Sequence, residues 1–105
     1  MLMLSTVTFP ATSAAEFVKK AIEELTNNPY PEFTKRDYYF KFSGEGLVMY
    51  IIYDIAAGNE EAALRDINER IFKFSNAIDG FKPTLEPLIG FEDAFSLINM
   101  TAPEQ

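Results

Sequence analysis

Apolar residues occupy both faces of one predicted strand near the middle of the chain, residues 47–55 (LVMYIIYDI). Successive side chains of a strand point to opposite faces of its sheet. One face would carry Leu47, Met49, Ile51, Tyr53 and Ile55, and the other would carry Val48, Tyr50 and Ile52. Two helices can cover only one face of a small sheet, so the other face needs a second cover, most simply another copy of the protein.

Three further strands are predicted around this one. Residues 2–9 contain several β-favouring residues, and residues 36–42 alternate between an aromatic set and a mostly polar set. The glycine-containing segment 43–46 (SGEG) would join the latter strand to residues 47–55 as a hairpin. Residues 81–89 form the last predicted strand, and its two prolines, which lack ladder donors, favour an edge position.

Two helices are predicted between the strands. The first begins at Ser13, which forms a capping-box pattern with Glu16, and the asparagines and prolines of residues 27–31 end it. Its expected apolar stripe consists of Val18, Ala21, Ile22 and Leu25. The second helix would be capped by Asn59 and stopped at Gly80.

The second predicted helix has an apolar side and a charged side. The core seam consists of Leu64, Ile67, Ile71, Phe74 and Ile78, and Phe72 is also expected to pack in the core. The acid–base pairs at i, i+4 are Glu61–Arg65, Asp66–Arg70 and Glu69–Lys73. Such pairs stabilise a helix when they lie on its solvent-exposed side, and we expect all three pairs to be exposed.

Residues 1–105 are expected to form a single α+β domain with the order β-α-β-β-α-β. This is the ferredoxin-like plan, in which both helices lie on one face of a four-stranded antiparallel sheet. Residues 91–98 carry acids followed by apolar residues at helical spacing. They predict a short C-terminal helix, with an extra strand as the alternative.

The chain resembles the dimeric α/β-barrel superfamily in its element order over residues 1–90, the two-faced strand LVMYIIYDI and the ending PTLEPLIGFEDAFSLI. It is similar to small uncharacterised members related to antibiotic-biosynthesis monooxygenases, YciI-like proteins and stress-responsive proteins. The resemblance implies a homodimer formed through the sheet face opposite the helices. Several relatives use a histidine, or Trp with Asn, and this chain has neither His nor Trp, so no site residue carries over.

The amino-acid composition excludes several kinds of catalysis, metal binding and binding partner. The chain has no His and no Cys, which excludes Ser-His-Asp and Cys-His catalysis, histidine-ligated metals and disulfides. A net charge of −7 opposes binding to nucleic acid or to anionic membranes. No D-x-D-x-D-G spacing is present, and we expect no metal and no cofactor. The absence of Cys and of a signal-peptide pattern predicts a cytoplasmic protein.

Aromatic residues supply the best candidate ligand-binding positions: Tyr38, Phe40, Tyr50 and Tyr53. A tyrosine provides an apolar wall and a hydrogen-bonding hydroxyl. The alternative is that these residues only fill the core. Asp54 is the candidate catalytic base, because a desolvated carboxylate has a raised pKa; alternatively, it lies in solvent at the strand end or pairs with Lys41 or Arg36.

Two functions fit these residues. The first is a non-catalytic homodimeric binder that holds a small hydrophobic or aromatic molecule in a pocket between sheet and helices. The second is a cofactor-independent oxygenase or isomerase acting on a phenolic or enolic substrate, in which Asp54 or a tyrosine removes a proton. An interaction or regulatory module is a third reading. The lack of His, Cys and Trp favours binding over catalysis.

Overall fold

A computed structural model describes residues 1–104 as a four-stranded sheet with helices. The strands are β1 (Leu2–Phe9), β2 (Thr34–Ser43), β3 (Gly46–Ile55) and β4 (Lys82–Leu88). The α-helices are α1 (Ala14–Asn27), α2 (Glu60–Ala77) and α3 (Phe91–Ser96), and a 3-10 turn, η1 (Ala11–Ser13), precedes α1. The predicted α+β class with an antiparallel sheet is confirmed.

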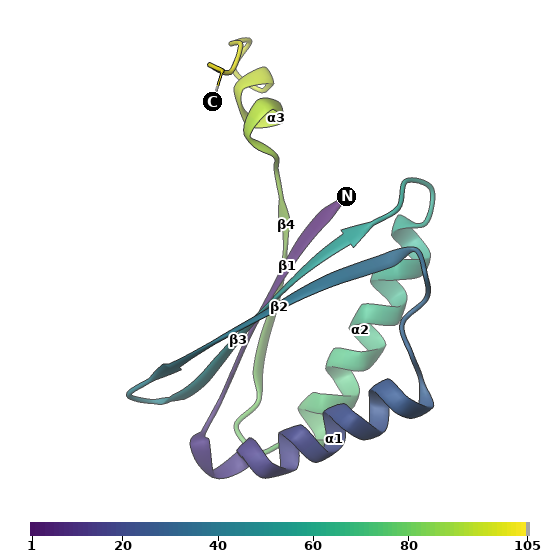
Figure 1. Ribbon diagram of the computed structural model, residues 1–105, viewed down its shortest axis with the longest axis vertical. Coiled ribbons are helices and arrows are strands. Elements are labelled where there is room, and N and C mark those ends of the chain that lie inside the picture. Colours follow the sequence, from purple (N-terminus) through teal and green to yellow (C-terminus); the bar gives the residue numbers. More distant parts are fainter. Residues whose placement is uncertain (105) are drawn as a thin grey trace.

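The sheet has the strand order β2-β3-β1-β4, and every neighbouring pair is antiparallel. Helices α1 and α2 both lie on one side of it (Figure 1). This arrangement is compatible with a ferredoxin-like fold. The proline-containing strand β4 lies at an edge, as predicted, and pairs only with β1.

Strand β3 has the two apolar faces that its sequence predicts. Met49, Ile51, Tyr53 and Ile55 are buried in the core cluster together with residues of α1 and α2. On the other face of β3, Val48 is buried, whereas Tyr50 and Ile52 are only partly buried. The sheet face opposite the helices therefore remains open in a single chain.

The first helix turns a different stripe towards the core from the one expected. Phe17 is buried and Ala21 packs against the core, whereas Val18, Ile22 and Leu25 are exposed. Phe17 stacks on Phe9 with ring centroids 4.5 Å apart. This contact fixes the rotation of α1, because a large aromatic ring contributes more burial than the smaller aliphatic side chains beside it.

Neither predicted helix cap forms with a side chain. The 3-10 turn brings Ser13 into helical backbone geometry, and its Oγ instead donates to the Asp79 carbonyl at 2.8 Å. Asn59 precedes α2 but makes no side-chain cap. A cap needs extended backbone at the capping residue, and neither residue has it.

The charged side of α2 is only partly solvated, contrary to expectation. Arg65 forms the predicted exposed contact with Glu61 at 4.0 Å, but Arg70 is 5% exposed and bonds Asp66 at 2.9 Å. Lys73 pairs with Glu24 of α1 rather than with Glu69. The expectation for Phe72 is also wrong, since this side chain is 67% exposed on the outer side of α2.

The connection between β2 and β3 is a tight turn at Gly44 and Glu45, as predicted. Gly46 has a φ of +140°, which side-chain-bearing residues rarely adopt. A Cβ on Gly46 would lie 2.3 Å from the Phe9 carbonyl oxygen. Only glycine allows β3 to start this close to the end of β1.

The C-terminal segment forms a helix, in agreement with the first of the two alternatives. Figure 1 shows α3 standing away from the two-layer body at the end of β4. Leu97, Ile98 and Met100 are exposed there. Among residues 1–104, none of the helices combines the length and the apolar character that crossing a membrane requires.

Candidate ligand-binding site

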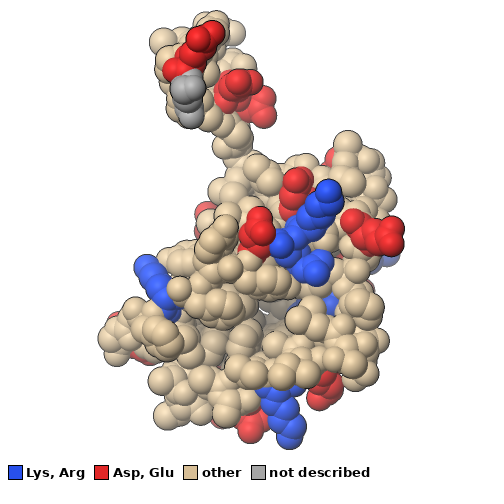
Figure 2. All heavy atoms as spheres, viewed as in Figure 1, with Lys and Arg blue, Asp and Glu red and all other residues tan. Residues whose placement is uncertain are grey.

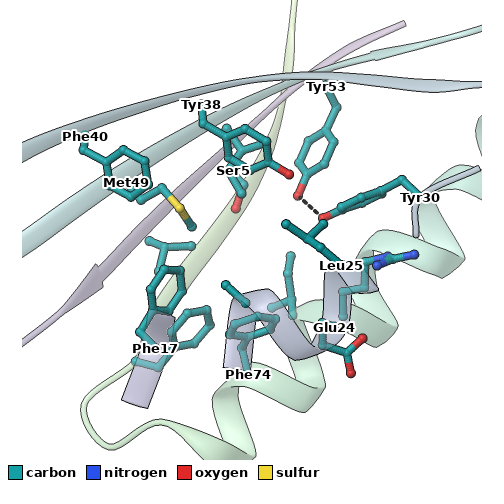
Figure 3. A pocket seen from close by; sticks show the side chains of 16 residues that line it. Ser5, Phe17, Glu24, Leu25, Tyr30, Tyr38, Phe40, Met49, Tyr53 and Phe74 are labelled. Carbon is teal, nitrogen blue, oxygen red and sulfur yellow. Dashed lines mark hydrogen bonds between the residues drawn. The ribbon is translucent and has the colours of Figure 1, made fainter. Parts of the chain in front are cut away.

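A cavity of about 330 Å³ lies between the sheet and the two long helices. This volume is at the lower end of the range typical of small-molecule sites, about 300–1,000 Å³. Strands β1, β2 and β3 supply one side, and α1 and α2 supply the other (Figure 3). The cavity is open to solvent on the β2 side, where its lining residues Tyr38 and Phe40 are 40% and 57% exposed.

The walls of the cavity are largely apolar. Its apolar lining includes Phe17, Leu25, Phe40, Met49, Ile71 and Phe74. Figure 3 shows Met49 and Phe40 on the sheet side facing Phe17 and Phe74 on the helix side. Around the hollow in Figure 2 most surface atoms belong to uncharged residues, and the charged side chains lie mainly at the periphery.

Three tyrosine hydroxyls gather at one end of the cavity. The hydroxyls of Tyr30 and Tyr53 lie 3.4 Å apart, and either one can donate to the other. Tyr38 reaches towards this pair from the neighbouring strand (Figure 3). The cavity therefore has a polar end made of neutral hydrogen-bonding groups, while the rest of its wall is mostly hydrocarbon.

Two arginines hold this polar end in place. Arg36 donates from Nε to the Tyr38 hydroxyl at 3.1 Å and from Nη1 to the Thr34 carbonyl at 2.8 Å. The guanidinium carbons of Arg36 and Arg70 lie 4.0 and 3.8 Å from the centroid of the Tyr30 ring. At these distances only one guanidinium fits over each ring face, so the two arginines enclose Tyr30 between them.

Arg70 also fixes the loop that carries Tyr30. Its Nη1 and Nη2 donate to the carbonyls of Asn28 and Pro29, the latter at 3.1 Å. These two carbonyls follow the end of α1, where the backbone lacks helical partners. One buried side chain thus joins α2 to the loop and positions the Tyr30 hydroxyl beside Tyr53.

Burial keeps the two central phenols neutral. Desolvation raises the pKa of Tyr53 far above that of a free tyrosine, and the neighbouring Tyr30 raises it further. Desolvation also raises the pKa of Tyr30, while the hydrogen bond with Tyr53 opposes that shift. Both groups are therefore protonated at neutral pH and can donate hydrogen bonds, but neither is a ready base.

Ser5 adds a polar group on the floor of the cavity. It is 0% exposed, and its hydroxyl finds no hydrogen-bond partner within the described chain. Figure 3 shows this hydroxyl pointing from β1 into the cavity, between Tyr38 and Met49. A buried hydroxyl without a partner is costly, and since Ser5 is 0% exposed a bound molecule would reach it only after a shift of the surrounding side chains.

The structure brings together three of the four predicted ligand-binding residues. Tyr38, Phe40 and Tyr53 all line the cavity. Tyr50 lies on the opposite sheet face, where it is paired with Tyr39 and has the Lys41 ammonium 5.5 Å from its ring. The alternation of β3 requires this separation, because Tyr50 and Tyr53 are an odd number of residues apart.

The candidate base Asp54 lies away from the cavity. It is exposed near the end of β3, in register with Leu2 and Lys35 on the open face of the sheet. This agrees with the solvent-exposed alternative. Glu24 does touch the cavity, but Figure 3 shows its carboxylate directed away from the tyrosines.

Sequence reasoning missed Tyr30, Ser5 and Arg70. Tyr30 lies in the loop between α1 and β2, where no periodicity indicates a direction. Ser5 could have been found, since alternation in β1 places it on the same face as Met3 and Val7. Arg70 has the i, i+4 spacing of a surface ion pair, and nothing in that spacing indicates its burial.

No protein-family model, no curated protein and no solved structure matches the chain. Within residues 1–104, no three acidic, cysteine or histidine side chains converge in the way a metal site requires.

Proposed function

We propose that this protein binds a small hydrophobic or aromatic molecule in the cavity between the sheet and the helices. The cavity itself carries this proposal: an apolar chamber of about 330 Å³ that ends in three tyrosine hydroxyls. Small-molecule sites characteristically combine a predominantly apolar lining with a few placed polar groups. The unpartnered hydroxyl of Ser5 supports the same reading.

We further propose that the binder is a homodimer of ferredoxin-like chains joined through the open sheet face. Four strands at about 4.8 Å spacing, each with about eight residues, present roughly 500 Å² per copy. Two copies would bury roughly 1,000 Å², near the lower limit for a specific interface. Partly buried Leu4, Tyr50 and Ile52 form the apolar centre of this face.

Catalysis on a phenolic or enolic substrate is the alternative, and the site favours it less. Proton removal needs a base in the cavity, but Asp54 is exposed on the other face of the sheet. The raised pKa of both Tyr30 and Tyr53 keeps them protonated at neutral pH. Such groups could stabilise an oxyanion, but another group would have to take the proton.

A cavity-filling variant tests the binding proposal. Leu25 lines the cavity from an exposed position on α1, so Leu25→Trp should fill the space without disturbing the core. We expect equilibrium dialysis to show at least about tenfold weaker binding of 2-ethylnaphthalene than in the wild type. Ile22→Trp is the matched control, because Ile22 is exposed on the same helix and does not line the cavity.

The result expected for the control is unchanged affinity. Failure of 2-ethylnaphthalene and 2-acetylnaphthalene alike to bind the wild type would overturn the proposal. Equal weakening by both tryptophan variants would place the binding site outside the cavity.

A further inference from the structure

The geometry points to a ligand that carries a neutral carbonyl oxygen at one end of an apolar body, such as an aromatic ketone, aldehyde or ester. This inference rests on the proposed binding function and specifies which molecules the cavity selects.

Tyr38 has its proton available for a ligand. A phenolic hydroxyl has one donor and two acceptor positions. Arg36 Nε donates to the Tyr38 oxygen at 3.1 Å and so occupies one acceptor position. A hydrogen bond from a cation draws electron density from the oxygen and strengthens the remaining O–H as a donor.

The Tyr30–Tyr53 pair offers a second proton. Only one of the two hydroxyls donates in the hydrogen bond that joins them at 3.4 Å, and the other keeps its proton. A phenol carries its proton at neutral pH, and burial raises the pKa of both tyrosines further. Two phenolic protons at the polar end, one from this pair and one from Tyr38, are thus not used within the trio and can be donated to an acceptor oxygen of the ligand.

A neutral acceptor fits this end better than a carboxylate. Arg70 is committed to Asp66, Asn28 and Pro29, and its guanidinium stacks on Tyr30. Nε and Nη1 of Arg36 are likewise engaged. A buried carboxylate would thus lose its hydration and could gain at most one direct contact, with Nη2 of Arg36, whereas the hydroxyls offer a carbonyl oxygen donors that carry no charge of their own.

Within residues 1–104, the acidic side chain that lines the cavity does not compete for these protons. Glu24 touches the cavity, but its Oε1 lies 3.8 Å from Lys20 and 3.5 Å from Lys73, and Figure 3 shows it turned away from the tyrosines. Ser5 lies on the sheet floor, where its hydroxyl can serve a second polar atom of the ligand.

Three probes with the same two-ring body test the inference by equilibrium dialysis: 2-acetylnaphthalene, 2-ethylnaphthalene and 2-naphthoate. We expect the ketone to bind the wild type about five- to tenfold more tightly than the hydrocarbon, the effect of one or two net hydrogen bonds. The carboxylate should bind more weakly than the ketone. Equal affinity of ketone and hydrocarbon would overturn the claim that the site selects an acceptor oxygen. Binding of the carboxylate as tightly as the ketone would overturn the claim that this acceptor is uncharged.

Tyr38→Phe should reduce the preference by weakening ketone binding while leaving hydrocarbon binding unchanged, because the proton of the Tyr30–Tyr53 pair remains. Tyr39→Phe is the matched control, because Tyr39 is the next residue and faces the open side of the sheet. An unchanged ketone preference in Tyr38→Phe would contradict the assignment. These outcomes differ from failure of the binding function itself, in which neither ketone nor hydrocarbon binds the wild type.

Discussion

At the scale of single residues, Arg70 determines much of the candidate site. It is the only arginine or lysine among residues 1–104 whose side chain is buried in the core region. Its donors satisfy two loop carbonyls and Asp66, and its guanidinium supports the Tyr30 ring. Because planar guanidinium geometry makes these contacts together, lysine cannot replace it.

Replacing this side chain should destabilise the fold. Arg70→Ala leaves the Asn28 and Pro29 carbonyls without their donor, and we expect the free energy of unfolding to fall by about 2–4 kcal/mol. Urea denaturation measures this change. Arg65→Ala is the control, because its exposed contact with Glu61 should contribute at most about 0.5 kcal/mol. A similar small effect of both variants would contradict the role given to Arg70.

The buried phenols should govern stability at alkaline pH. The pKa of Tyr30 and Tyr53 is raised in the folded chain above the usual value near 10, so above that pH the unfolded chain releases protons that the folded chain retains. Stability is therefore complete below about pH 10 and falls as the pH rises above it. Absorbance of tyrosinate should show that Tyr30 and Tyr53 ionise at a higher pH in the folded chain than in the unfolded chain.

Tyr53→Phe provides the comparison for this titration. It should reduce the slope of stability against pH above pH 10, because one of the two groups no longer titrates. Ionisation of Tyr30 and Tyr53 in the folded protein at the pH of a free tyrosine would contradict the burial described for this pair.

At the scale of elements, strand β3 contributes its two faces to two different surfaces of the protein. One face forms the cavity floor through Met49, Ile51 and Tyr53, and the other contributes Tyr50 and Ile52 to the open face. A strand with a single solvated face would alternate between apolar and polar residues. The composition of β3 is therefore the main argument for a covering partner.

Charge on the open face should disrupt the proposed dimer. Ile52→Asp would place an unpaired carboxylate in the interface, and we expect a monomer by size-exclusion chromatography with light scattering. Tyr39→Asp, at an exposed position of the same face, gives a second variant that the single chain should tolerate. Phe72→Asp, on the outer side of α2, should leave assembly unchanged. A stable dimer in both open-face variants would contradict this interface.

The strands were predictable from the sequence to a greater extent than the helix faces or the site. Alternation placed Tyr38, Phe40 and Tyr53 on the side of the helices because the period of a strand is local. The stripe of α1 was misassigned because Phe17 and Val18 are both apolar, and only packing against Phe9 selects between them. Tyr30 depends on a loop fixed by a residue 40 positions away, a contact that no local pattern encodes.

At the scale of the whole molecule, the two-layer arrangement leaves apolar surface in several places. Exposed apolar side chains lie on α1, at the hairpin end near Phe42, and on the segment containing α3. Figure 1 shows that α3 lies far from α1 and α2. The cavity adjoins the exposed apolar surface of α1 at Leu25 and differs from the other two surfaces in containing the hydroxyl groups described above.

Methyl NMR of the protein labelled with ¹³C at the methionine methyl groups tests the central claim most directly. Met49 lines the cavity, whereas Met1 and Met100 are exposed outside it. On addition of 2-acetylnaphthalene, the Met49 signal should shift saturably while those of Met1 and Met100 remain in place. An unchanged Met49 signal, or equal shifts of all three, would contradict ligand binding in this cavity.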